Sequence, residues 1–504
     1  MDNKGSKKLL PWGKKDVIGV TAVYVVNLFV LAGLFIAAVF FNGRRGGQPF
    51  AEYFSSLSSF FSFLVVLVLL IGVMALFFLF ESRDFLRSPA NSEMLFLIME
   101  AGLFICYVCG NYINPYVRPL AFVAVTTLFL VNSRTAVFMN FVFCILTFLF
   151  DAFSGSTTDM NGYSVVFFLV MGAASGIIAV YVLADVYSRG KLLALSFPVS
   201  LPVLICIALP MIEFGSEGDR LITLLSGFFS GPLSIASFLI LLPFFESVFK
   251  KVTCFKYAEL TDHKAKYIRK LIEQAPGTFN HAIVVSNIAE ACATAIGEDA
   301  LLARTCAYYH DIGKLRRPEF FKENQADGEN PHDDLTPELS ANIIKSHTQD
   351  GYSLAKKARL PEEIARVCLE HHGTLPIWYF YAKAKKFTDG EVPILQYCYP
   401  GPKPQSKISA IIMIADGCEA AARSLKDRSR EKVNEAVKKI VSDRMQLGQF
   451  DECELTIKEI NIIINTVVNR LTGVYHKRIE YPTVSLEGID VKKEEADLQS
   501  EEQE

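Results

Sequence analysis

"YYHDIGKL", residues 308–315, places a histidine and an aspartate side by side, His310 and Asp311, with Lys314 three residues later. Neutral imidazoles and carboxylates are ligands that divalent transition metals accept. Adjacent helix positions point about 100° apart, so the imidazole can face one ion while the carboxylate, with two oxygens, bridges to a second. The pair therefore predicts a metal site.

The chain around this stretch divides by composition. Of its 504 residues, 51% are hydrophobic, and the mean hydropathy is +0.30. Residues 1–250 contain 15 lysines and arginines and 14 aspartates and glutamates, against 35 and 39 in the remainder. This split predicts a membrane half followed by a soluble half. The net charge of −3 argues against a nucleic-acid polymer as partner, and the scattered cysteines indicate a reducing compartment.

Apolar runs long enough to cross a bilayer, about 17–25 residues, occur at 17–41, 58–80, 94–112, 163–184, 192–212 and 221–245. The apolar stretch 119–150 is interrupted by "NSRTA" at 132–136, which predicts two shorter spans joined by a tight turn, and eight spans in all. Lysines and arginines gather before the first span and in the even-numbered loops, which predicts that both termini are cytoplasmic. Glu100, inside the third span, has either a functional role or a hydrogen bond within the bundle.

Beyond residue 250 the apolar periodicity is helical and strand signals are nearly absent. The expected fold class is all-α, a polytopic transmembrane bundle followed by a cytosolic all-helical domain. The expected boundaries are 1–250 for the bundle, 251–276 for a connecting helix, 277–483 for the soluble domain and 484–504 for a disordered acidic tail. Thr261 or Asp262 can cap the start of the connecting helix, and Pro276 with Gly277 ends it.

Six of the eight histidines fall within about ninety residues of the soluble half. A single histidine on an apolar helix is usually a hydrogen-bonded core residue. Two adjacent pairs in one helical domain, His310–Asp311 and His371–His372, favour a metal site instead.

The pattern of His281, then His310–Asp311, then Asp416 resembles the signature of HD-domain phosphohydrolases. The resemblance extends over about 260–482 to the cytoplasmic part of the seven-transmembrane HD proteins, the PgpH-type cyclic di-AMP phosphodiesterases of bacteria. It is carried by "APGTFNHAIVVSNIAEA", "HDIGKLRRPEFFKENQ", "ENPHDDLTPELSA", "IIKSHTQDG", "EHHGTLPIWYFYAKA", "YPGPKPQSK" and "YHKRIEYP". The chain departs from the family after its first span, where about fifteen residues stand in place of a large extracellular domain.

The resemblance implies two bound divalent transition metals, manganese or iron. The positions that match the family's ligands are His281, His310, Asp311, His347, His371, His372 and Asp416, with Asp311 as the bridging carboxylate. One member of the His371–His372 pair could instead lie outside the ligand set.

Two further positions match the family. Lys314 could stabilise charge in the transition state, or be a surface charge at a helix end. His332 could bind a substrate phosphate or support a metal ligand, or it could form a local hydrogen bond in a turn.

The resemblance implies a membrane-anchored phosphodiesterase that hydrolyses a cyclic dinucleotide, cyclic di-AMP to the linear pApA, at the inner face of the cell membrane. The implied partners are this nucleotide, membrane lipid and, in a homodimer, a second copy. "HHGTLPIWYF" replaces the "GYP" of the cyclic di-GMP branch. Two alternatives remain, a membrane receptor that binds a nucleotide without cleaving it and a transporter with an accessory domain.

Overall fold

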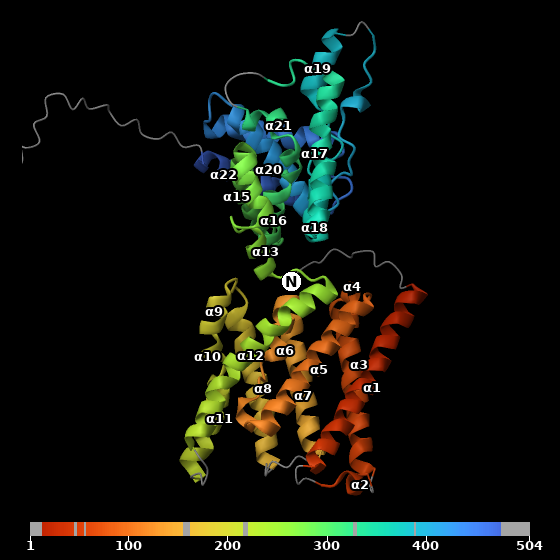
Figure 1. Cartoon of the computed structure of the whole chain (residues 1–504), viewed down its shortest axis with the longest axis vertical. Coiled ribbons are helices and arrows are strands. Elements are labelled where there is room, and N and C mark those ends of the chain that lie inside the picture. Colours follow the sequence, from red (N-terminus) through yellow and green to blue (C-terminus); the bar gives the residue numbers. More distant parts are fainter. Residues whose placement is uncertain are drawn as a thin grey trace, which may run out of the picture. The chain divides into compact units, whose positions relative to one another are not determined.

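The computed structural model describes residues 13–44, 48–54, 57–154, 162–214, 220–325, 330–387 and 390–474. Within these ranges every named element is a helix, and the expected all-α fold class is confirmed (Figure 1). The chain divides into two compact units, Met1–Asp262 and His263–Glu504. The acidic tail expected at 484–504, and the end of the soluble domain expected before it, lie outside the described residues.

The first unit is a bundle of apolar helices. Its elements are α1 (Lys14–Arg44), α2 (Phe50–Tyr53), α3 (Ser58–Glu81), α4 (Arg83–Leu86), α5 (Pro89–Tyr112), η1 (Pro115–Val117), α6 (Phe122–Leu130), α7 (Ser133–Phe153), α8 (Gly162–Leu183), α9 (Arg189–Ala194), α10 (Ser196–Val199), α11 (Leu201–Phe214), α12 (Arg220–Phe249) and α13 (Cys254–Leu260).

Seven helical segments among the described residues are long and apolar enough to cross a membrane, one fewer than the eight expected spans. The difference lies in the fourth span, which is the shorter apolar segment Pro115–Leu130. As expected, the chain turns at "NSRTA", where the side chain of Asn132 accepts a hydrogen bond from the amide of Thr135 and caps α7.

Contacts at the helix ends show the direction of each helix. The ends of α1 and α7 meet where Asn42 Nδ2 donates to Ser154 Oγ at 3.0 Å, and Tyr107 near the end of α5 donates to Asn42 Oδ1 at 2.9 Å. At the other side Arg134, which starts α7, pairs with Glu81, which ends α3, at 3.1 Å. Helices α5 and α7 therefore run in the same direction, and η1 with α6 must return between them.

The short return segment is tolerated because protein surrounds it. The first residues of α6, from Phe122 to Val125, have no exposed surface, and irregular backbone at membrane depth is acceptable where the protein buries it. The buried Arg118 just before α6 pairs with Asp151 at the end of α7. Among the described residues the bundle thus has seven full-length apolar helices and one shorter return segment, and both ends of the bundle fall on one side.

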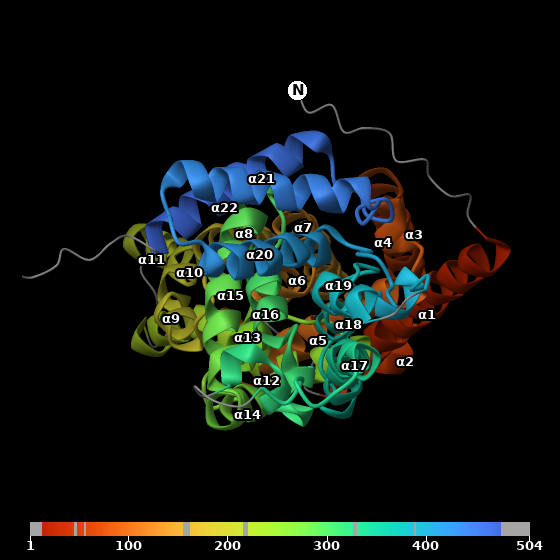
Figure 2. The ribbon, with the colours of Figure 1, turned by 90° about the horizontal axis from the view of Figure 1, so that it is seen from above.

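The second unit contains the helices that carry the predicted site. Its elements are α14 (Lys266–Gln274), α15 (Pro276–Ile296), α16 (Ala300–Tyr309), η2 (Ile312–Arg316), η3 (Pro318–Phe320), η4 (Lys322–Asn324), α17 (Pro337–Lys357), α18 (Glu362–Glu370), α19 (Trp378–Phe387), η5 (Ile394–Tyr397), α20 (Lys407–Ser424), α21 (Arg430–Gln446) and α22 (Ile457–Val474). Helix α15 packs against α16, α20 and α22, and α17 packs against α18 and η2. Helices α20, α21 and α22 lie side by side (Figure 2).

The structure divides the single connecting helix expected at 251–276. Thr261 ends α13 rather than starting a helix, because its hydroxyl donates to the carbonyl of Tyr257 at 3.1 Å. Helix α14 follows after a turn. Pro276 begins α15, where its missing amide hydrogen leaves no helical hydrogen bond unmade.

Candidate metal centre

All seven predicted ligand residues meet at one place in the second unit. His281 comes from α15, His347 from α17 and Asp416 from α20, while His310–Asp311 and His371–His372 directly follow α16 and α18. Their ligand atoms form three overlapping groups, each within 4.8 Å: His281, His310 and Asp416; His310, Asp311 and His371; and His347, His371 and His372.

Asp311 joins the groups. Its Oδ2 lies 3.2 Å from Nε2 of His310 and 3.9 Å from Nε2 of His281. Its Oδ1 lies 3.3 Å from Nε2 of His347 and 3.6 Å from Nε2 of His371. Each carboxylate oxygen therefore faces a different set of imidazoles, which is the arrangement that a bridging ligand requires.

Helix geometry sets the orientation of three of the imidazoles. The Nδ1 atoms of His310, His347 and His371 lie 2.7, 2.6 and 2.9 Å from main-chain carbonyl oxygens three or four residues earlier. A carbonyl only accepts, so each Nδ1 must carry the hydrogen. Each Nε2 then presents its lone pair to the interior, as metal-binding histidines commonly do.

Electrostatics keep the cluster ready for cations. Burial lowers the pKa of His347 to about 3, so this imidazole stays neutral. Burial alone would raise the pKa of Asp311, but the neighbouring charge of Lys314 holds it well below its usual range. The nitrogen and oxygen donors suit divalent transition metals. Nε2 of His310 and Oδ1 of Asp311 are buried without a hydrogen-bond partner, so the residues present fit a bound metal.

Glu419 supports His281 from behind. Its Oε2 lies 2.6 Å from Nδ1 of His281, whose Nε2 lies 3.0 Å from Oδ1 of Asp416. Burial opposes the charged imidazole, yet these two carboxylates raise the pKa of His281 to about 9. Arg423 pairs with the other oxygen of Glu419.

Lys314 lies inside the site rather than at the surface. Its side chain is only 12% exposed, and its Nζ lies 2.7 Å from Oδ2 of Asp311 and 2.7 Å from Oε1 of Glu323. The helical turn that carries it approaches α17 closely: a β-carbon on Gly313 would lie 1.8 Å from the carbonyl oxygen of His347. The glycine of "HDIGK" is thus required by packing.

His332 is not part of the cluster. It is buried between the rings of Phe320 and Phe380, and its Nε2 donates to the carbonyl of Phe320 at 3.0 Å. This contact matches the local hydrogen bond that was one of the two predictions for His332.

Sequence reasoning missed two residues at the site. Glu323 follows Lys314 by nine residues, in the separate short helix η4, and no periodic pattern connects them. Tyr399 begins "YPGPKPQSK", one of the stretches that carry the family resemblance. Its ring stacks on His372 with centroids 4.3 Å apart.

Comparison with known proteins places the chain among relatives. Residues 23–253 match the family model "7TM receptor with intracellular HD hydrolase", and residues 278–421 match the HD domain. The chain is 37% identical to the cyclic-di-AMP phosphodiesterase PgpH of Bacillus subtilis over 80% of its own length and 56% of that protein. It is also 37% identical to PgpH of Listeria monocytogenes, over 82% of its own length and 58% of that protein.

The chain therefore spans a little over half the length of these curated relatives. Among solved structures, the HD domain of L. monocytogenes PgpH in complex with cyclic-di-AMP is 48% identical, with 43% of this chain and 99% of that chain covered and a TM-score of 0.41. With its apolar bundle and its HD domain each matched, the chain belongs to the multi-pass membrane family of 7TM receptors with an HD hydrolase domain.

Proposed function

We propose that this chain is a membrane-anchored, metal-dependent phosphodiesterase that hydrolyses cyclic di-AMP to pApA. The observation that carries the proposal is the position of Asp311, whose two oxygens face two different sets of imidazoles. The substrate is inferred from the names of the two curated relatives, both cyclic-di-AMP phosphodiesterases.

The ligand set is part of the proposal. His281, His310, Asp311 and Asp416 would hold one manganese or iron ion, and Asp311, His347, His371 and His372 a second. When bound, two such ions neutralise phosphoryl oxygens and make a nucleophile available at neutral pH. Hydrolysis adds water across one 3′–5′ phosphodiester: the bond from phosphorus to the 3′ oxygen breaks, that oxygen gains a proton, and a 5′-phosphate remains.

The chain's own residues orient the imidazoles of this site and place a positive charge in it. Main-chain carbonyls hold three imidazoles, and Glu419 holds a fourth. Lys314 keeps a positive charge beside Asp311, where it can offset negative charge that develops on the phosphoryl group. The buried position of His332 supports a role in holding η3 in place, through its hydrogen bond to Phe320, rather than direct contact with substrate.

We also propose that the catalytic unit, expected at 277–483, faces the cytoplasm. Arg83, Arg87, Arg134, Arg189, Lys191, Lys250 and Lys251 all lie in segments on the side of the bundle where the chain enters and leaves it. Basic residues in short loops favour the cytoplasmic side.

The decisive experiment uses the full-length chain in detergent with Mn²⁺ and a panel of cyclic dinucleotides, with products resolved by chromatography. The proposal expects cyclic di-AMP to yield pApA, and expects the Asp311→Ala variant to be inactive. Saturable binding of cyclic di-AMP without product, by metal-loaded wild-type protein, would overturn it in favour of a receptor.

A further inference from the structure

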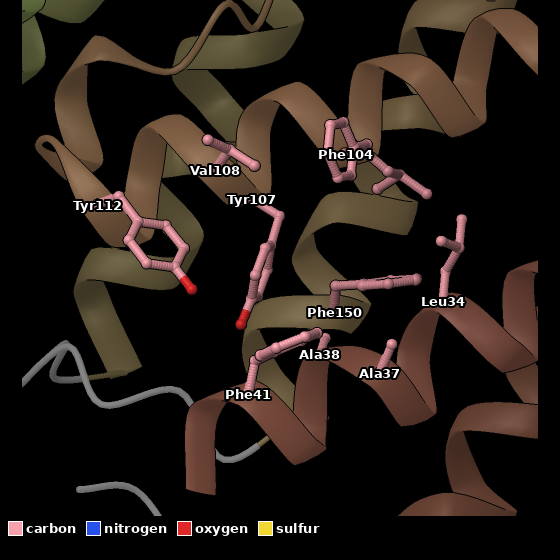
Figure 3. Close-up of a pocket in the computed structure, with 10 residues that line it drawn as sticks. Leu34, Ala37, Ala38, Phe41, Phe104, Tyr107, Val108, Tyr112 and Phe150 are labelled. Carbon is pink, nitrogen blue, oxygen red and sulfur yellow. The ribbon is translucent and has the colours of Figure 1, made fainter. Parts of the chain in front are cut away.

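A cavity of about 360 Å³ lies between α1 and α5 of the membrane bundle, with one wall from α7 (Figure 3). Its lining is almost entirely hydrocarbon and consists of Leu34, Ala37, Ala38, Phe41, Leu103, Phe104, Tyr107, Val108, Tyr112 and Phe150. Ala37 and Ala38 account for the hollow, because larger side chains at these positions of α1 would fill it. Phe41, Phe104 and Tyr112 are exposed at the rim, so the cavity opens sideways out of the bundle.

The wall behind the cavity is firmly packed. Phe150 meets Phe35 edge to face at 5.5 Å, and Phe35 stacks on Phe63 at 3.8 Å. These rings join α1, α3 and α7, so the hollow is bounded by a fixed aromatic surface.

One end of the cavity is polar. The hydroxyls of Tyr107 and Tyr112 point toward the end where α1 finishes (Figure 3). There Tyr107 donates to Asn42, which donates in turn to Ser154. Arg44, the last residue of α1, is exposed and lies one turn beyond Phe41, with its guanidinium 4.6 Å from the centre of the neighbouring Phe40 ring. An apolar trough that ends in hydroxyls and a cation matches an amphiphile with an anionic head.

The length of the trough matches one leaflet. From Leu103 to Tyr112, nine steps at about 1.5 Å each extend about 13.5 Å along α5. Half of a hydrocarbon core about 30 Å thick is about 15 Å.

We propose that this cavity binds one acyl chain of an anionic phospholipid, with the phosphate beside Arg44. A water-soluble ligand would find too few polar partners. A helix of a second copy is too wide, at about 10 Å with its side chains, for a hollow of this volume.

The test uses the full-length chain, extracted from nanodiscs of phosphatidylglycerol and phosphatidylethanolamine and examined by native mass spectrometry. Wild type should retain one phosphatidylglycerol after mild delipidation. Ala37→Trp, which fills the trough, should lose it, and Val68→Trp, on an exposed part of α3, should retain it. Arg44→Gln should reduce the preference for phosphatidylglycerol over phosphatidylethanolamine. Equal retention in Ala37→Trp and Val68→Trp, or no retained lipid in wild type, would overturn the proposal.

A second inference concerns Tyr399 and rests on the proposed function. The half-buried ring of Tyr399 stacks on His372 at 4.3 Å and meets His347 edge to face at 5.9 Å. Its amide donates to the carbonyl of Leu375 at 3.0 Å, which fixes the loop over the cluster. Among the described residues, no hydrogen bond engages its hydroxyl.

We infer that the Tyr399 hydroxyl donates a hydrogen bond to a phosphoryl oxygen of the substrate, while its ring holds His372 in place. Tyr399→Phe keeps the ring, so it should retain metal content but lower kcat by about 10²-fold, the effect of losing one fixed donor. Its affinity for pApA, measured by calorimetry, should fall about tenfold. Tyr399→Leu should in addition lose metal.

These measurements separate the role of the Tyr399 hydroxyl from the proposed function. Loss of metal in Tyr399→Phe, or unchanged kcat and pApA affinity, would overturn the role of the hydroxyl. If wild type hydrolyses no cyclic dinucleotide, the proposed function fails, while pApA binding still tests the contact with phosphate.

Discussion

Removal of the buried lysine, Lys314→Met, tests the electrostatics of the site most directly. The variant leaves the buried carboxylate of Asp311 and the half-buried carboxylate of Glu323 without the cation that lies 2.7 Å from each. Removing one partner of a buried ion pair costs about 3–5 kcal/mol. In the metal-free chain this should lower Tm by about 6–20 °C, at about 2–4 °C per kcal/mol for a unit of this size.

In the metal-bound chain the fall in Tm caused by Lys314→Met should be less than half as large, because a divalent ion replaces the lysine as the charge next to Asp311. Trp378 fluorescence in a Trp12→Phe background reports the second unit alone, since the chain has only these two tryptophans. The matched control is Lys356→Met, which breaks an exposed pair with Glu362 and should leave Tm nearly unchanged. An equal loss in chelator and in Mn²⁺, or a loss no larger than that of Lys356→Met, would refute the reasoning.

Three further predictions address the ligands. Asp311→Ala should remove both metals, whereas His347→Ala should weaken mainly one; elemental analysis distinguishes these results, and equal metal loss would argue against a bridging carboxylate. Glu419→Gln should weaken metal affinity by about 10- to 100-fold, because it no longer orients His281 as an anionic acceptor, and a metal titration of unchanged midpoint would contradict this. The metal-free chain should lose stability as pH falls below 6.5, because unfolded His347 gains a proton that the buried side chain, with a pKa of about 3, does not take up. Through this group the free energy of unfolding should fall by up to about 1.4 kcal/mol per pH unit. Denaturant titrations should show that this contribution is absent in His347→Asn.

The sequence predicted the elements that depend on local pattern. Long apolar runs became full-length helices, and Asn132 marked a real helix start. Of the two shorter spans expected at 119–150, only the first, Pro115–Leu130, is short, and other helices bury it; the second is the full-length helix α7. The end of a helix at Thr261 was not predicted. The Thr261 hydroxyl binds a main-chain carbonyl there, and the spacing of apolar residues carries no sign of such a contact.

For the site, the family signature named seven residues that the structure brings together. Their role as ligands remains a prediction. Glu323 and Tyr399 were missed because they reach the cluster from the short helix η4 and a loop, through contacts that only the folded chain creates.

The placement of His310 and His371 has a consequence for the order of ligand binding. Each is the residue at the C-terminal end of its helix, α16 or α18. A helix C-terminus carries a partial negative charge of about half an elementary charge, and both termini adjoin the carboxylates of Asp311 and Asp416. If the chain acts on a cyclic dinucleotide as proposed, this end of the site would repel the anionic substrate until cations are present. Cations would then associate first and the nucleotide second, and the supply of metal would control capture of the nucleotide as well as its turnover.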